Sequence, residues 1–281
     1  MTTTLTSDRP AVTRRPIRHG RPLTRVSGLG FGVAMLWFSL LVLIPLTAVV
    51  VTATTGGWAG FWEAVTTEQT LAAIELTVGT AFAVTLVNIV IGTMIAWVLV
   101  RDRFFGKRIL EIIIDIPFAL PTIVAGLVLL SLYGPKSPLG IDIANTRQAV
   151  FLAFLFVTLP FVVRTVQPVL AELDRDVEEA AMSLGASRIT VFRRIILPSL
   201  TPAIAAGAAL SFARGVSEYG SLVLLSGNLP NQTEVTSVRI LSSIENDNLD
   251  SAAAVATILL VISFVVLILV DYLQRRLVRR G

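Results

Sequence analysis

The sequence predicts an all-α integral membrane protein with six transmembrane helices and one short cytoplasmic helix between the fourth and the fifth. Composition is the first reason. The chain of 281 residues is 54% hydrophobic and only 15% charged, and its mean hydropathy is +0.79. A soluble domain carries about 25% charged residues, so this deficit indicates a chain that lies largely in a membrane. The deficit extends along the whole sequence, which predicts a single membrane domain.

The length of the apolar runs is the second reason. A transmembrane helix needs about 20 mostly apolar residues. Six runs meet this requirement: 29–51, 76–100, 112–133, 149–170, 200–225 and 252–270. The first run exceeds the 7–15 apolar residues of a signal peptide and no clear cleavage site follows it, so it is predicted to be a retained span. Pro117 and Pro121 should kink the third run, and Arg164 and Pro168 interrupt the fourth.

The third reason is the distribution of basic residues. Six arginines precede the first run, and four basic residues follow each of the second, fourth and sixth runs. The loops on the other side hold only Lys136, Arg147 and Arg239. Because basic residues accumulate on the cytoplasmic side, both termini are expected there, in a multi-pass protein of a bacterial cell membrane. Residues 1–28 are predicted to form a polar cytoplasmic tail, and residues 29–281 the membrane domain.

Several residue types are absent, and this excludes whole classes of chemistry. The chain has no cysteine, and its single histidine, His19, lies in the polar tail. Disulfides and thiolate metal sites are therefore excluded, and no nucleophile–base pair or metal cluster is recognisable, so neither catalytic nor metal-binding residues are predicted. The pattern G-x-x-x-x-G-K-[ST] is also absent, so the chain is not expected to bind ATP itself.

The segment 174–198 is a polar interruption between the fourth and fifth runs, and it reads as two short helices. Four residues follow the helical spacing i, i+3, i+4, i+7: Val177, Ala180, Ala181 and Leu184,. Asp174 suits the N-cap of this first helix, and Gly185 suits a left-handed residue just after its end. Ser187 can cap the second helix, and Pro198 would either end that helix or begin the fifth span.

Three interpretations of this segment are weighed. The small face of the first helix, with two alanines followed by Gly185, favours a rigid projection that fits a groove in a partner. An amphipathic helix lying in the membrane interface without a partner explains the pattern equally well. A helix-turn-helix that binds DNA is disfavoured because both ends of the segment are tethered to the bilayer, so no nucleic-acid partner is predicted.

The spacing within the segment resembles the EAA motif of binding-protein-dependent ABC importer permeases. The matching positions are Glu179, Ala180, Ala181, Gly185, Ile195, Leu197 and Pro198. The resemblance implies the six-helix, MetI-like bundle of that family and assigns these residues to the helix that couples the permease to an ATPase. It further implies two copies of a separate ATPase, which would bind ATP and Mg, so that this chain needs no cofactor.

A second informative stretch, residues 213–234, begins inside the fifth run. Arg214 and Glu218 lie four residues apart on one helix face, and charges within a span are costly enough to be functional candidates,. A structural ion pair facing the bundle interior explains them equally well. Gly215 and Gly220 flank the pair and should allow close helix packing. The candidate translocation path comprises Arg214, Ser217, Glu218, Tyr219 and Ser221.

This stretch resembles the T-type permeases of sulfate/thiosulfate importers. The similarity rests on the run SEYGS at 217–221, the turn SGNLP at 226–230 and the pair TE at 233–234. Ser217 departs from the family, which usually has glycine before this glutamate. The resemblance implies a second, W-type permease, an extracytoplasmic sulfate-binding protein and surrounding membrane lipid as partners. Substrate specificity would reside mainly in the binding protein, so no tight sulfate site is expected in this chain alone.

Two alternative functions remain open. Molybdate permeases share the glutamate–aromatic–glycine core and the turn, so a molybdate or tungstate importer is the first alternative. The second is an anion carrier driven by an ion gradient, which needs a proton or sodium site near the midplane. Arg214 and Glu218 are its only candidate relay.

Overall fold

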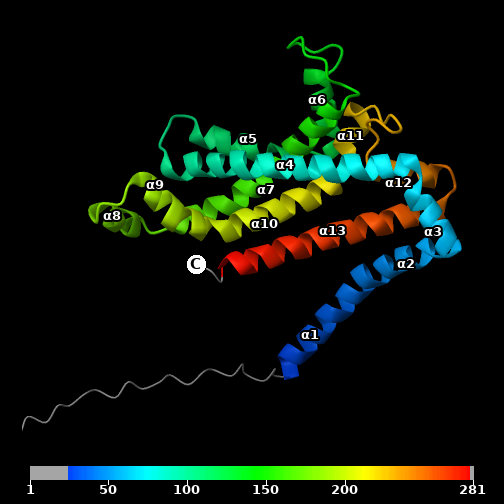
Figure 1. Ribbon diagram of the computed structural model, residues 1–281, viewed down its shortest axis with the longest axis horizontal. Helices are drawn as coiled ribbons and strands as arrows, with labels where there is room; N and C mark the ends of the chain where they lie inside the picture. The colour runs from blue at the N-terminus through cyan, green and yellow to red at the C-terminus, as the bar shows by residue number, and fades with distance from the viewer. Residues whose placement is uncertain (1–24, 279–281) are drawn as a thin grey trace, which may run out of the picture. The chain divides into compact units, whose positions relative to one another are not determined.

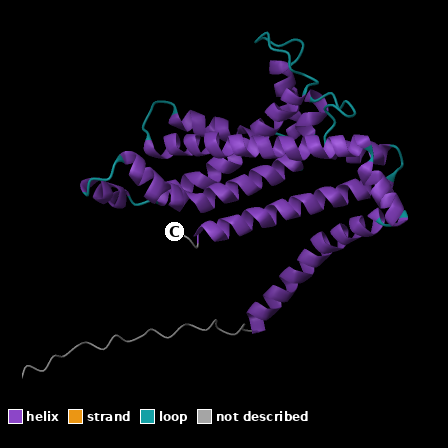
Figure 2. Ribbon diagram, in the orientation of Figure 1, coloured by secondary structure: helices purple, strands orange, loops and turns teal. Residues whose placement is uncertain are grey.

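The computed structural model describes residues 25–278. The predicted tail, 1–28, therefore lies outside the described residues except for its last four positions, and the boundary after residue 28 stays a prediction. Throughout the described range the chain consists of helices joined by turns and loops, without a strand (Figure 2), as the predicted all-α class requires. The helices fall into two units, one that ends at Thr47 and one that begins at Ala48, and each is described by itself.

The first unit is the N-terminal part of one long apolar helix. It contains α1 (Arg25–Phe38), the π-helical turn η1 (Ser39–Leu43) and the start of α2 (Ile44–Ala53). The uninterrupted stretch Ser27–Ala53 is long and apolar enough to cross a membrane, as predicted for 29–51. Almost all of the large apolar side chains of this stretch make little contact within their own unit and are exposed there.

The second unit holds the remaining helices (Figure 1). In chain order they are α3 (Gly57–Thr66), α4 (Glu68–Arg101), α5 (Lys107–Ala119), α6 (Thr122–Tyr133), α7 (Arg147–Glu172), α8 (Arg175–Ser183), α9 (Arg188–Val191), η2 (Phe192–Ile196), α10 (Leu197–Val216), α11 (Gly220–Leu225), α12 (Thr236–Glu245) and α13 (Leu249–Val278). Helices α4, α7 and α10 pack against one another, and α13 packs against α10, α12 and α3. Within this unit, α8 and α9 lie at one end of the long helices, and α3 and α12 lie at the other.

The number of membrane spans agrees with the predicted six only if one bent pair of helices is counted as a single span. Among the described residues, five helices are long and apolar enough to cross a membrane, and a sixth span results if α5 and α6 are counted together. The sequence predicts a kink in this third run, but α5 and α6 are bent by 117° and form two separate helices. The break follows from Pro121, since a proline disfavours helical geometry in the residue before it, and Leu120 is extended, with φ −85° and ψ 136°,.

The fifth predicted run is also divided. Its helix begins earlier than expected, because α9, η2 and α10 are continuous, and it ends at Val216. Pro198 lies in the first turn of α10 but inside the continuous stretch Arg188–Val216, so it neither ends a helix nor begins the span, and both predicted alternatives are wrong. The wider turn η2, in which the Leu197 N–H donates to the Phe192 carbonyl, precedes it and accommodates the missing proline N–H,. After a three-residue break, α11 starts at Gly220.

Three apolar clusters form the core of the second unit: a small one joins α3 to α13, and a polar node lies between the two larger ones. The cluster nearer α12 includes Phe154 and Phe212, and the cluster nearer α8 is built on side chains of α4, α7, η2 and α10. Asn88 of α4 is fully buried and donates from Nδ2 to Thr158 Oγ1 of α7 (2.7 Å) and to Ser211 Oγ of α10 (3.1 Å). This node holds the three central helices in register, as interhelical polar contacts do within membranes.

Candidate functional site

The helix α8 is shaped by local signals that the sequence displays. The Asp174 carboxylate accepts a hydrogen bond from the Asp176 N–H (2.9 Å) and caps the N-terminus. At the other end the Gly185 N–H donates to Met182 O (2.9 Å) and the Ala186 N–H donates to Ala181 O (3.1 Å). These two bonds form a Schellman motif, in which Gly185 adopts the required left-handed conformation, with φ +91°,. The helix therefore has defined ends.

The helix α8 is also fixed to the bundle by a tertiary contact. Arg101, the last residue of α4, forms an ion pair with Glu178, and their side chains are only 11% and 17% exposed. The Arg101 guanidinium lies 5.6 Å from the centre of the Trp97 ring, which in turn makes an edge contact with Phe192 of η2. The helix α8 is therefore tied to the end of α4 and, through Trp97, to η2.

The residues of the EAA pattern are distributed between the surface and the bundle. Glu179, Ala180, Gly185, Leu197 and Pro198 are exposed, whereas Ala181 and Ile195 are half-buried and pack against the nearby core cluster. Apolar side chains are exposed around them: Val177, Leu184, which is 89% exposed, and Ile189, which is 70% exposed. Exposed apolar groups clustered at a helix end are typical of a surface that meets a partner or a membrane interface.

The two adjacent glutamates of α8 are expected to differ in importance for stability. Glu178→Gln removes the charge that faces the poorly exposed Arg101 and should destabilise the protein by about 2 kcal/mol, as expected for a hydrogen bond between charged groups,. Glu179→Gln is the matched control, because Glu179 is exposed and makes no hydrogen bond to the described residues. Thermal unfolding in detergent checks this prediction. Equal unfolding temperatures for the two variants would contradict it.

The candidate translocation residues divide into a buried group and an exposed pair. Arg214 Nη2 lies 2.6 Å from Glu218 Oε2, and the Glu218 side chain is fully buried. The other carboxylate oxygen, Oε1, accepts from both the N–H (2.9 Å) and the hydroxyl (2.8 Å) of Ser221. Ser217 and Tyr219 are exposed, and the Ser217 hydroxyl donates to the Arg214 carbonyl (3.1 Å). Glu218 therefore connects α10 to the first turn of α11 across the break.

The two broken helices pack against each other at the breaks, and glycines allow the contact. A Cβ atom on Gly126 of α6 would lie 2.6 Å from the Ser221 carbonyl oxygen. A Cβ on Gly220 would lie 2.9 Å from the Ile123 nitrogen. The backbones of α6 and α11 thus approach more closely than any side chain would permit. The close packing predicted at Gly220 is confirmed, and Gly215 likewise lies close to Ala81 of α4.

Sequence reasoning missed a second ion pair, between half-exposed side chains of α5 and α7. Arg164 of α7 binds Asp115 of α5 through both carboxylate oxygens, with Nε–Oδ1 at 2.7 Å and Nη2–Oδ2 at 2.5 Å. Its guanidinium also donates to the Glu111 carbonyl (3.1 Å) and to Gln167 Oε1 (2.8 Å). The available signal was one acidic and one basic residue in separate apolar runs. The pairing itself follows only from the packing of α5 on α7.

The fold and the site together define a helical bundle of the polytopic membrane class, with five or six candidate spans among the described residues, a capped surface helix and two broken helices. Residues 88–279 match the family described as "Binding-protein-dependent transport system inner membrane component". This match covers more than half of the chain, so the chain belongs to that family.

Curated relatives resemble the chain along almost its full length. It is 41% identical over 259 residues to the "Sulfate transport system permease protein CysT" of Salmonella typhimurium, covering 90% of this chain and 94% of the relative. It is 40% identical to the protein of the same description in Escherichia coli K12, with the same coverage. The Synechocystis protein of that description is 42% identical over 250 residues, which is 86% of this chain and 87% of the relative.

Solved structures with low sequence identity share the fold. One chain of a bacterial alginate ABC transporter, in complex with its pentasaccharide-bound periplasmic protein, superposes with a TM-score of 0.74 at 17% identity and covers 90% of this chain and 95% of that chain. A chain of the inward-facing MetNI methionine ABC transporter gives 0.52 at 20% identity, covering 76% of this chain and 98% of that chain. Both agree with the predicted six-helix permease bundle.

Proposed function

We propose that this chain is the permease subunit of an ATP-driven importer of sulfate or thiosulfate. The observation that carries the proposal is the identity of about 40% to curated sulfate permeases over 90% of the chain. The segment matching the EAA pattern supports the ATP-driven mechanism, since it lies on a rigid and exposed helix. The chain itself performs no catalysis, and a separate ATPase binds ATP and Mg and hydrolyses ATP.

Coupling follows from the connections of α8. When ATP closes the ATPase dimer, the groove that holds residues Glu179 to Gly185 moves and carries α8 with it. The ion pair of Glu178 with Arg101 passes the movement to α4, and the continuous α9–η2–α10 helix passes it to the break after Val216. The bundle thereby changes from inward-facing to outward-facing as a packed unit.

The path in this chain is built for passage rather than for tight binding. Arg164 and Arg214 are the basic side chains well inside the predicted spans, and within the described residues each is paired with a carboxylate. Neither offers an unpaired positive charge on which a dianion would be trapped. Tyr219 remains exposed, and its hydroxyl, which has no partner among the described residues, can donate to a passing anion, whereas the exposed Ser217 hydroxyl donates to the Arg214 carbonyl.

The partners and the orientation follow from the same assignment. A second, W-type permease completes the path, two ATPase copies engage the coupling helices, and an extracytoplasmic binding protein delivers the anion. The side of the membrane that carries α8 is the cytoplasm, and both termini lie there, which agrees with the distribution of basic residues,.

Uptake of labelled sulfate by a strain that lacks this gene, with and without the restored gene, tests the proposal. Restored uptake that thiosulfate inhibits and molybdate leaves unchanged is the expected result. Inhibition by molybdate alone would instead establish the molybdate or tungstate importer. The purified chain by itself should bind no labelled sulfate at micromolar concentrations, and micromolar binding would contradict the passage mechanism.

A carrier driven by an ion gradient is the second candidate, and the pairing of the half-buried Arg214 with the buried Glu218 is the observation that favours it. This pair is the one arrangement that sequence reasoning identified as a possible proton relay. Uptake that persists after ATP depletion, while the proton gradient is held, would establish the carrier. Uptake that stops under these conditions supports the ATP-driven permease.

A further inference from the structure

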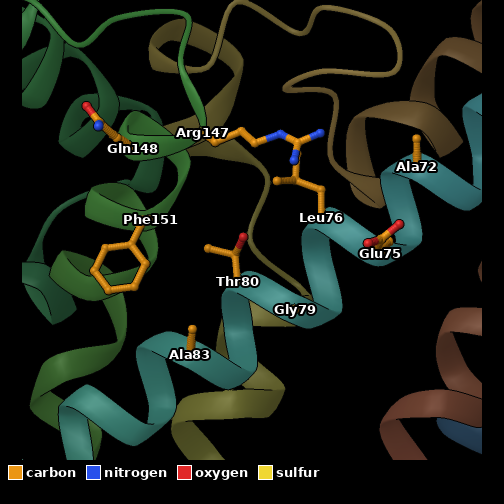
Figure 3. A pocket seen from close by; sticks show the side chains of 9 residues that line it. All are labelled: Ala72, Glu75, Leu76, Gly79, Thr80, Ala83, Arg147, Gln148 and Phe151. Atoms are coloured by element: carbon orange, nitrogen blue, oxygen red, sulfur yellow. The ribbon is translucent and has the colours of Figure 1, made fainter.

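A cavity of about 470 Å³ opens between α4 and α7, away from the residues discussed so far. Its lining combines small or apolar side chains with four polar ones, Glu75 and Thr80 from α4 and Arg147 and Gln148 from α7. Figure 3 shows Arg147 reaching from α7 across toward α4, on which Thr80 and Glu75 lie about one helical turn apart. We call this feature the Arg147 cavity.

The position of the Arg147 cavity is determined by the course of α7. Arg147 is the first residue of this helix, which runs to Glu172, three residues before α8 begins. A helix of 26 residues is about 39 Å long, which exceeds the apolar thickness of a bilayer,. The cavity and α8 therefore lie on opposite sides of the membrane. If α8 meets a cytoplasmic ATPase, the cavity opens on the side from which the substrate arrives.

Two side chains that line the cavity have hydrogen-bond donors without an acceptor among the described residues. Arg147 Nε donates to the Gln232 carbonyl (3.1 Å), which holds the guanidinium in place, while its two terminal nitrogens make no hydrogen bond within the described part of the chain. The Thr80 hydroxyl likewise has no partner among the described residues. By contrast, Thr77 and Thr85 of the same helix donate to backbone carbonyls at 2.7 Å. Thr80 and Arg147 are therefore available to an oxyanion.

The cavity is lined by one negatively charged and one positively charged side chain, Glu75 and Arg147. Glu75 is exposed and forms no ion pair with Arg147 or with any other described residue. The cavity thus presents one attracting and one repelling charge to an anion. A volume of about 470 Å³ accommodates a small dianion together with several waters, each of which occupies about 30 Å³ in the liquid,. Such a site binds weakly, because a solvent-exposed charge pair changes affinity by at most about fivefold.

We propose that the Arg147 cavity is a weak capture site for the hydrated, tetrahedral oxyanion substrate on the side of arrival. Arg147 attracts the anion, Thr80 and Gln148 donate hydrogen bonds, and Glu75 keeps the affinity low enough for the anion to move on. This inference rests on the proposed function for the identity of the anion. The presence of an anion site is tested separately from transport.

The chain contains no cysteine, so Ala83→Cys places a single thiol in this chain at the exposed edge of the cavity without removing a polar group. The assembled transporter in membrane vesicles is labelled with N-ethylmaleimide, a neutral reagent, in sodium sulfate or in sodium gluconate of equal ionic strength. Sulfate in the millimolar range should slow labelling of this chain. Leu139→Cys, an exposed loop position, is the matched control that sulfate should leave unchanged.

Each charged residue of the cavity is then neutralised in turn, and the two changes should shift the half-protecting sulfate concentration in opposite directions. In the Ala83→Cys background, Arg147→Gln should raise the half-protecting sulfate concentration roughly three- to fivefold, and Glu75→Gln should lower it by a similar factor. Absence of protection, or protection that Arg147→Gln leaves unchanged, overturns the proposal. A thiol that never reacts in the assembled transporter also overturns it, because the cavity would then be covered by another subunit. Protection without sulfate uptake by cells would retain the site and reject the proposed substrate.

Discussion

Replacing Gly185 with tryptophan is expected to reduce sulfate uptake roughly thirtyfold or more while leaving membrane insertion intact. The factor corresponds to the 2 kcal/mol or more that a central interface residue contributes. A Cβ atom on Gly185 would meet no atom of the described chain within 4 Å, so an added side chain starts from open space at the surface of α8. The obstruction therefore arises in the partner's groove. The measurement is labelled sulfate uptake at matched expression levels.

Backbone strain has to be separated from bulk in this experiment. Gly185 has φ +91°, which strains any other residue by about 1–2 kcal/mol,. Gly185→Ala carries the same strain without the bulk and should retain most transport. Ala180→Trp adds bulk on an exposed helical position without backbone strain and should also block transport. If both tryptophan variants transport normally, the coupling role of α8 is rejected. If Gly185→Ala is as inactive as Gly185→Trp while Ala180→Trp transports normally, backbone strain rather than bulk explains the loss.

The second large effect concerns the contact between the two broken helices. Gly126→Ala places a Cβ atom 2.6 Å from the Ser221 carbonyl oxygen and 2.9 Å from its Cα, so the backbone of α6 or α11 must shift. Overpacking of this kind destabilises a protein by about 1–3 kcal/mol. The thermal unfolding temperature in detergent should therefore fall by roughly 5 °C.

Gly79→Ala in α4 is the matched control for this prediction. A Cβ atom there meets nothing within 4 Å, and an alanine in a helix is more stable than a glycine by about 0.5–1 kcal/mol,. Its unfolding temperature should equal or exceed that of the unchanged chain. A Gly126→Ala variant that unfolds at the same temperature as Gly79→Ala would show that α6 and α11 do not depend on close backbone contact.

Local patterns were sufficient to predict the helical class, the spans and the shape of α8. Apolar run length depends on composition alone, and the caps at Asp174 and Gly185 depend on residues only a few positions apart. The EAA spacing also lies within one short segment. Features that depend only on residues a few positions apart can be predicted, because the interacting groups are neighbours in the chain.

The angle between α5 and α6 and the end of α10 at Val216 could not be predicted in the same way. A proline or a buried charge shows where a helix is weak, but not whether it bends or breaks. That outcome depends on whether another backbone can satisfy and pack against the separated parts. Here the close approach at Gly126 and Gly220 provides this packing, and Glu218 joins α10 to α11 through Ser221.

The sequence by itself indicated a membrane permease, located most of its long apolar helices and identified the helix that has the coupling pattern. Only the tertiary structure decided that Glu178 rather than Glu179 fixes that helix to α4, and that Arg164 pairs with Asp115. It alone also brought Glu75 and Arg147 to one cavity. The physical reason is range. Helix formation and membrane insertion depend on nearby residues, whereas charge pairing and cavities depend on which distant helices pack together.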